Sequence, residues 1–124
     1  MDLLLDTHAV IWWLADDAKL TARQRSAIQD KRNTCFISAA TVWEISIKAA
    51  IGKLAIEGDY MKQLRSEGFI ELPIRWAHAR AVQELPLHHR DPFDRLLVAQ
   101  AALEGMSLVS SDEFVAKYDV RVVG

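Results

Sequence analysis

Three aspartates occupy sequence positions from which their side chains could act together. Asp6 directly follows a short apolar run, residues 3–5, and Asp112 follows a second apolar run, residues 107–110. Asp94 falls in the first turn of a predicted helix. In an open α/β sheet, the carboxyl ends of the strands and the starts of the following helices border one crevice. We therefore expect these three carboxylates to lie close together.

A fourth carboxylate, Glu44, lies inside an apolar stripe of another predicted helix. Ala40, Ile47 and Ile51 have the spacing that places them on the same helical face as Glu44. An alternative is a surface ion pair with Lys48 at i+4, which typically contributes only about 0.3–0.5 kcal/mol. The apolar stripe favours the interpretation that Glu44 joins the site.

Clustered carboxylates predict a particular chemistry. Two of them within ~4 Å repel by roughly 4 kcal/mol at an effective dielectric constant of 20, so they protonate unless a cation compensates them. Ligands that are all oxygen favour Mg²⁺ or Mn²⁺. Such a site suits hydrolysis of a phosphodiester by metal-activated water.

Each aspartate also has a structural explanation. Asp6, Asp91 and Asp112 can serve as helix N-caps, and Asp94 can complement the helix dipole in the first turn. For Asp91 the sequence leaves open whether it binds metal or only caps its helix. Asp6, Asp94 and Asp112 are predicted to lie close together, and this favours a shared functional role over three unrelated capping roles.

The elements that must position these residues alternate along the chain. Apolar runs predict strands over residues 3–5, 34–37, 69–72, 107–110 and 120–123. Periodicity and capping signals predict helices, caps included, over residues 9–14, 21–30, 38–51, 59–66, 75–84, 91–104 and 113–118. This alternation favours an α/β fold with a parallel sheet covered on both faces, and the length of 124 residues favours one domain over residues 1–124.

Composition restricts the possible partners. With 51% hydrophobic and 26% charged residues, the chain is too apolar for intrinsic disorder. The 15 Lys and Arg against 17 Asp and Glu leave no overall positive field, so any nucleic-acid contact must be local. The single Cys35 can form no internal disulfide, and no signal peptide or membrane span is predicted. We expect a soluble, cytoplasmic protein.

Aromatic and histidine side chains suggest further roles. Trp12 and Trp13 are adjacent on a short predicted helix, and we expect one of them to face a homodimer or another protein partner. His8, His88 and His89 fall near the predicted site, where a structural or orienting role is expected. No glycine-rich phosphate loop or paired CxxC motif supports a nucleotide-cofactor or zinc site.

Four segments together resemble the PIN-domain ribonucleases, most closely the VapC-like toxins of type II toxin–antitoxin modules. They are Leu-Leu-Leu-Asp6-Thr7-His8, Val42-Trp43-Glu44-Ile45, His89-Arg-Asp91-Pro-Phe-Asp94-Arg95 with the helix that follows, and Leu108-Val-Ser110-Ser-Asp112. They occur in the order found in that family and span almost the whole chain. Ser110 departs slightly, because the family often has threonine there, but the hydroxyl is retained.

The resemblance implies a three-layer α/β/α sandwich with a central, mostly parallel sheet and an endoribonuclease that depends on Mg²⁺ or Mn²⁺. It implies an RNA substrate, with transfer RNA as a candidate, and a cognate antitoxin protein; we also expect a homodimer. By matching positions, the metal-binding and catalytic residues are Asp6, Glu44, Asp94 and Asp112.

Contacts with RNA phosphates must come from a few local cations. Arg90 and Arg95 flank the acidic segment, and of these Arg95 is the first candidate. Its alternative is a solvated helix residue. Ser110 is expected to hydrogen-bond a neighbouring carboxylate or a metal-bound water.

Two other classes of function remain. A phosphoacceptor receiver-type domain shares the size and an acidic Mg²⁺ pocket, but it needs adjacent acidic residues after the first strand and a lysine after the last, and neither is present. A catalytically silent PIN-fold module that binds RNA or an antitoxin is the second. The presence of all four carboxylates argues against it.

Overall fold

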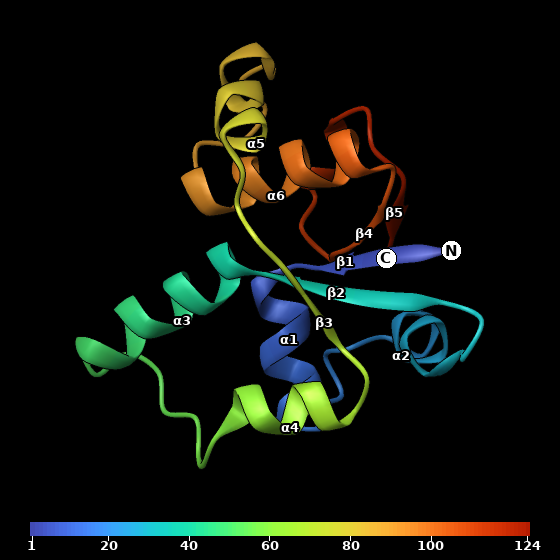
Figure 1. Cartoon of the computed structure of the whole chain (residues 1–124), viewed down its shortest axis with the longest axis vertical. Helices are drawn as coiled ribbons and strands as arrows, with labels where there is room; N and C mark the ends of the chain where they lie inside the picture. The colour runs from blue at the N-terminus through green and yellow to red at the C-terminus, as the bar shows by residue number, and fades with distance from the viewer.

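A five-stranded parallel sheet forms the centre of the molecule (Figure 1). The computed structural model describes the whole chain, residues 1–124. The strands are β1 (Asp2–Leu5), β2 (Thr34–Ser38), β3 (Ile70–Leu72), β4 (Ser107–Val109) and β5 (Val122–Val123). Their order is β3-β2-β1-β4-β5, and every pairing is parallel. The predicted α/β class is confirmed, with a sheet that is entirely parallel.

Helices cover both faces of the sheet. Figure 1 shows α5 and α6 on one side and α1, α2 and α4 on the other, while α3 extends beyond the strand ends. The helices are α1 (Thr7–Leu14), α2 (Ala22–Gln29), α3 (Ala39–Ala50), α4 (Tyr60–Ser66), α5 (Trp76–Ala81) and α6 (Pro92–Glu104). These are the three layers of an α/β/α sandwich, as predicted.

The central strand β1 divides the hydrophobic core by the alternation of its side chains. Leu3 and Leu5 pack in the cluster that includes residues of α1, α2 and α4, whereas Leu4 packs in the cluster that includes residues of α6. All three leucines are fully buried. A continuous apolar run is the expected sequence of a strand covered on both faces.

The strand order creates a crevice at the carboxyl end of β1. The chain leaves β1 towards β2 on one side, and β4 later pairs with the other side of β1. At such a reversal, the loops after the two strands separate in opposite directions and leave space between them. The residues that follow β1 and β4 include Asp6 and Asp112.

The capping signals in the sequence place the helix ends correctly. Asp91 caps α6 by accepting from the backbone N–H groups of Phe93 and Asp94, and Pro92 occupies the first turn. Gly105 closes this helix in the left-handed conformation, with φ of 68°. Thr21 and Gln24 form the predicted capping box of α2.

The helix expected over residues 9–14 begins earlier, at Thr7, because Asp6 caps it. Three other predicted elements differ in the structure. The helix expected over residues 75–84 is divided into α5 and a 3₁₀ turn, η1 (Val82–Glu84), and it ends where expected because Leu85, the residue before Pro86, is extended. The helix expected over residues 113–118 is one 3₁₀ turn, η2 (Val115–Lys117), which suffices to bury Val115 and Tyr118 three residues apart.

The third difference is the last strand, which is shorter than expected. Val120 donates its N–H to the carbonyl of Tyr118, and this tight turn delays β5 until Val122.

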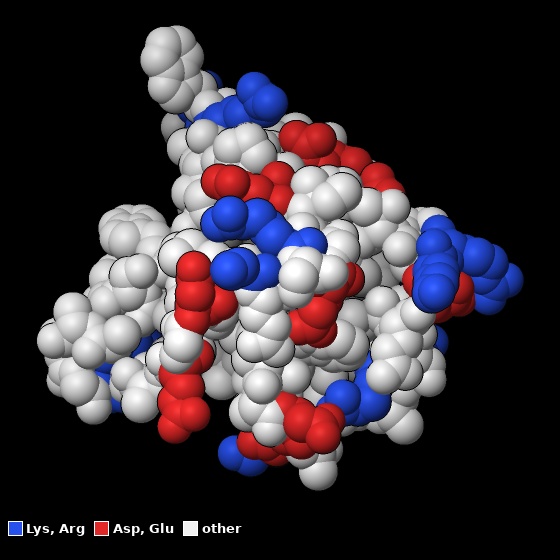
Figure 2. All heavy atoms as spheres, turned by 60° about the horizontal axis from the view of Figure 1, so that its bottom comes forward, with Lys and Arg blue, Asp and Glu red and all other residues white.

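The charged surface is mixed in sign. Figure 2 shows Lys and Arg side chains interspersed with Asp and Glu on the face that it presents, in keeping with the net charge of −2. No helix is both long enough and apolar enough to cross a membrane.

Candidate metal centre

Asp6 is a buried carboxylate at the carboxyl end of β1. Its side chain accepts a 2.8 Å hydrogen bond from the N–H of Ala9 and so caps α1, and its own N–H pairs with the carbonyl of Val109 in β4. Burial raises the pKa of Asp6, while the Ser110 hydroxyl and the N–H of Ala9 favour the charged form. Only one carboxylate oxygen of Asp6 caps α1, which leaves the other for a cation. The structural and functional interpretations of Asp6 are therefore compatible.

Asp94 lies in the first turn of α6, with 19% of its side chain exposed. Burial raises its pKa to about 7, and the negative charges of Asp91, Asp6 and Asp112 add to this effect. A buried carboxyl group with a raised pKa and other carboxylates beside it is a candidate functional-site residue.

Asp112, just beyond β4, has the opposite electrostatic character. Burial acts to raise its pKa, but hydrogen bonds from His89 and from the backbone of Phe114 and Val115 outweigh burial and hold the pKa below its usual value. The N–H of Phe114 donates to Oδ1 over 2.8 Å, and Oδ2 lies 3.0 Å from Nε2 of His89. Asp112 therefore stays ionised beside a carboxyl group that tends to hold its proton.

His89 brings the last two carboxylates together. Its Nε2 lies 3.0 Å from Oδ2 of Asp94 and 3.0 Å from Oδ2 of Asp112, and the three atoms all lie within 4.8 Å of one another. Sequence reasoning placed His89 near the site but did not identify this bridging contact. The only signal was its position two residues before the N-cap of α6.

Glu44 is 8% exposed on α3 and has two partners. Thr7, the residue after Asp6, donates a 2.6 Å hydrogen bond to Oε1, and Nζ of Lys48 lies 3.0 Å from Oε2. Both interpretations of Glu44 thus hold in part: it forms the i+4 ion pair, and it also contacts the β1–α1 junction beside Asp6.

Ser110 and Asp91 support the cluster from its edges. Ser110 is buried at the end of β4, where its hydroxyl accepts from the N–H of Asp112 and favours the charged form of Asp6. Asp91 uses Oδ1 to cap α6, and its charge raises the pKa of Asp94.

Arg95 does not point its donors to solvent. Its guanidinium donates to the carbonyls of Val82 at 3.1 Å and Pro86 at 3.0 Å and to the hydroxyl of Tyr118 at 3.1 Å. These bonds satisfy the turned-in carbonyls of the segment before α6, and the expected phosphate contact of Arg95 stays a prediction. Arg90 is exposed and lines a hollow of about 350 Å³ next to the cluster.

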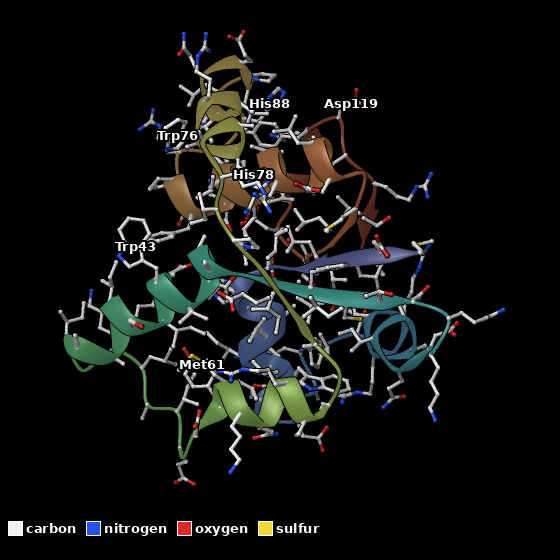
Figure 3. The ribbon with its side chains drawn as sticks, in the orientation of Figure 1. Trp43, Met61, Trp76, His78, His88 and Asp119 are labelled. Atoms are coloured by element: carbon white, nitrogen blue, oxygen red, sulfur yellow. The ribbon has the colours of Figure 1, made fainter.

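Trp12 and Trp13 each contact a neighbouring ring of the chain, and the expected contact of one of them with a partner stays a prediction. Trp12 stacks on His8 with ring centroids 5.5 Å apart, and Trp13 packs against Phe69 while its indole N–H donates to Glu67. Both are partly buried within the chain. The exposed tryptophans are Trp43 on α3 and Trp76 at the start of α5, which are 58% and 95% exposed and project from the ribbon in Figure 3.

The donor set fits a divalent cation that prefers oxygen. Asp94 and Asp112 lie together around His89, Asp6 is near enough for its charge to raise the pKa of Asp94, and no Lys or Arg forms an ion pair with any of the three aspartates. Burial raises the pKa of Asp94 most, and the negative charges of Asp91, Asp6 and Asp112 raise it further. Carboxylate oxygens suit Mg²⁺ and Mn²⁺.

Comparison with known proteins agrees with this architecture. Three similar solved structures are VapBC2 from Rickettsia felis bound to a DNA fragment from its promoter, VapBC-1 from nontypeable Haemophilus influenzae, and FitAcB from Neisseria gonorrhoeae. Their identities to this chain are 14%, 17% and 19%, with TM-scores of 0.69, 0.60 and 0.58. Each match covers 98% of this chain, and 97%, 96% and 96% of the other chains.

These likenesses establish the fold. A comparison with curated proteins finds no match. The sequence of residues 3–120 matches the family described as the PIN domain, which is nearly the whole chain. Because this match spans nearly the whole chain, the chain belongs to the PIN-domain family.

Proposed function

We propose that this chain is an endoribonuclease that depends on Mg²⁺ or Mn²⁺ and acts as the toxin of a toxin–antitoxin module. The proposal is supported by Asp94 and Asp112, which lie together around His89 at the start of α6 and the end of β4, and by Asp6, whose charge at the end of β1 raises the pKa of Asp94. Solved structures with this fold include VapBC and FitAB assemblies, which supports a toxin-like role and an antitoxin partner.

The three aspartates would hold the cation. A bound Mg²⁺ or Mn²⁺ supplies Lewis acidity at a phosphodiester oxygen and lowers the pKa of water. Asp6 is fixed by its cap to Ala9 and Asp112 by its cap to Phe114, so both carboxylates are oriented before any ligand arrives. Asp94 must lose the proton that its raised pKa retains near neutral pH.

We assign Glu44 to completing the coordination shell of the cation or to orienting a water molecule. Its hydrogen bond from Thr7 and its ion pair with Lys48 fix both carboxylate oxygens in direction. The remaining lone pairs of these oxygens can accept hydrogen bonds from water, since each carboxylate offers about four acceptor sites.

Substrate and partner contacts complete the proposal. Arg90 is the phosphate contact that we now favour, because it is exposed beside the cluster whereas Arg95 is occupied by backbone carbonyls. Transfer RNA is the candidate substrate, and the cytoplasm is the proposed compartment. Exposed Trp43 and Trp76 support contact with an antitoxin or a second copy of the chain.

A cleavage assay on total RNA tests the activity. The purified protein is incubated with Mg²⁺, Mn²⁺ or EDTA beside the variants Asp6→Asn and Asp119→Asn. Asparagine at position 6 can still cap α1, so we expect Asp6→Asn to fold normally and lose cleavage. Asp119 is exposed and outside the cluster, so Asp119→Asn is the matched control.

The outcomes separate two functions. Discrete products that require metal and are absent with Asp6→Asn support the endoribonuclease. Cleavage by Asp6→Asn at the wild-type rate contradicts the assignment. RNA or antitoxin binding by a folded wild-type protein that cleaves nothing favours the catalytically silent binding module.

A further inference from the structure

His89 is the one side chain in the cluster that is not a carboxylate. Its side chain is 16% exposed, and its Nε2 lies 3.0 Å from an oxygen of Asp94 and 3.0 Å from an oxygen of Asp112. At these distances it could be a further ligand for the cation, a competitor that occupies the space of the cation, or a donor that positions the two carboxylates. The hydrogen bonds of the ring distinguish among these roles.

The other ring nitrogen determines the tautomer. The backbone N–H of Asp91 points at Nδ1 of His89 over 3.1 Å. Nδ1 must therefore accept and carry a lone pair, which places the proton of the neutral ring on Nε2. A nitrogen that carries its proton cannot ligate a cation, because ligation needs the lone pair. In this arrangement Nε2–H donates to Oδ2 of Asp112 and lies 3.0 Å from Oδ2 of Asp94.

Further contacts hold the ring in place. The backbone N–H of His89 donates to the hydroxyl of Tyr118 over 2.9 Å, and Arg95 donates to the carbonyl of His89 over 3.4 Å. The imidazole packs against Phe114 with ring centroids 5.4 Å apart. Backbone, ring face and Nδ1 are each restrained, so the direction of the Nε2–H group is set by the fold.

We propose that His89 is a positioning residue that holds Asp94 and Asp112 together through its Nε2–H group, and that it is not itself a ligand. This proposal rests on the metal site of the proposed function. It leaves the ligand set all oxygen, which is compatible with Mg²⁺, whereas a nitrogen ligand would favour transition metals. Groups that orient ligands in this way typically change metal affinity by about 10-fold to 100-fold.

The test measures dissociation constants for Mg²⁺ and Mn²⁺ by calorimetry, without RNA, for wild type, His89→Leu, His89→Gln and His88→Leu. Leucine removes the donor, whereas the amide N–H of glutamine can replace Nε2–H. We expect His89→Leu to lower the affinity for Mg²⁺ and for Mn²⁺ by about 10-fold or more, with a similar factor for the two cations. His89→Gln should restore most of the affinity. His88 is the adjacent histidine (Figure 3) and has no contact with Asp94 or Asp112, so His88→Leu should match wild type.

A second measurement needs no variant. Nitrogen-15 NMR of the wild-type imidazole should show the proton on Nε2 both before and after saturation with Mg²⁺. Loss of that proton on saturation would identify His89 as a ligand and overturn the proposal. So would a gain in affinity in His89→Leu, which identifies a competitor, or an unchanged affinity in that variant.

Failure of the metal site itself gives a different result. In that case wild type binds neither cation, or Asp6→Asn binds both as wild type does, whatever residue occupies position 89. That result would overturn the metal site together with the role of His89. A positioning role that fails alone leaves the wild-type affinity and its dependence on Asp6 intact.

Discussion

The hydroxyl of Thr7 donates a 2.6 Å hydrogen bond to Oε1 of Glu44, and both side chains are buried. Thr7 begins α1 and Glu44 lies in the middle of α3, so this bond joins two helices at the crevice. Because Thr7 directly follows Asp6, any shift of Glu44 is transmitted to the backbone that carries the first aspartate. The bond couples the helix-borne glutamate to the proposed metal centre.

Thr7→Val should separate this bond from side-chain volume. Valine keeps the shape of threonine but has no hydroxyl, so Oε1 of Glu44 loses its donor in a buried environment, which typically costs about 1–3 kcal/mol. We expect a lower free energy of unfolding in urea and metal-dependent cleavage reduced about 10-fold, the size of effect typical for groups that orient ligands. Thr7→Ser keeps the hydroxyl and should retain most of the activity. Equal activity in the two variants would show that the bond has no role in catalysis.

The raised pKa of Asp94 predicts how stability changes with pH. In the folded, metal-free protein Asp94 keeps its proton up to about pH 7, whereas its ordinary pKa is 3.8. Between these values the folded state binds more protons than the unfolded state, so the free energy of unfolding falls as the pH rises. Metal binding requires the ionised carboxylate, so affinity for Mg²⁺ should rise over the same interval.

Asp94→Asn should remove both the fall of stability with rising pH and the stabilisation by Mg²⁺, because asparagine has no proton to lose. Asparagine carries no charge, so the metal-free variant should be more stable than wild type at pH 8, by up to about 4 kcal/mol. Added Mg²⁺ should raise the Tm of wild type but not of the variant. Thermal unfolding at pH 5 and pH 8, with and without Mg²⁺, checks both statements. A variant less stable than wild type at pH 8 would contradict the raised pKa.

Much of the site could be predicted from local sequence because its aspartates serve as cap or first-turn residues. Asp6, Asp91 and Asp112 each accept from backbone N–H groups of the turn that follows, and such patterns depend on a few consecutive residues. The same locality explains why α6 was predicted with its correct limits, from Asp91 at the cap to Gly105.

Contacts between distant segments could not be predicted in this way. The bridge from His89 to Asp112 spans 23 residues, and the contact of Arg95 with Tyr118 also spans 23. Both depend on how the segment before α6 packs against η2, and no periodicity or capping signal describes that packing. For this reason Arg95 was expected to bind phosphate, and the bridging contact of His89 was not identified.

Arg95→Ala should act mainly on stability. The variant leaves the carbonyls of Val82 and Pro86 without their donor and removes a partner of Tyr118, so we expect a loss of about 2 kcal/mol or more in the free energy of unfolding. Arg95→Lys should recover only part of this lost stability, because an ammonium group cannot donate to several separated acceptors as the guanidinium does. Urea unfolding measures both. Unchanged stability together with weaker RNA binding would return Arg95 to the role of phosphate contact.

Arg90→Ala should act on RNA binding instead. Arg90 is exposed beside the acidic cluster and forms no ion pair within the chain, so its removal should leave unfolding and Mg²⁺ affinity unchanged. A phosphate contact releases about one counterion, so the slope of log affinity against log salt concentration should become shallower by about one. RNA binding is measured with the inactive Asp6→Asn background to prevent cleavage. Arg80→Ala, an exposed arginine on α5 paired with Glu84, is the control. An identical salt slope in the two variants would show that Arg90 does not contact phosphate.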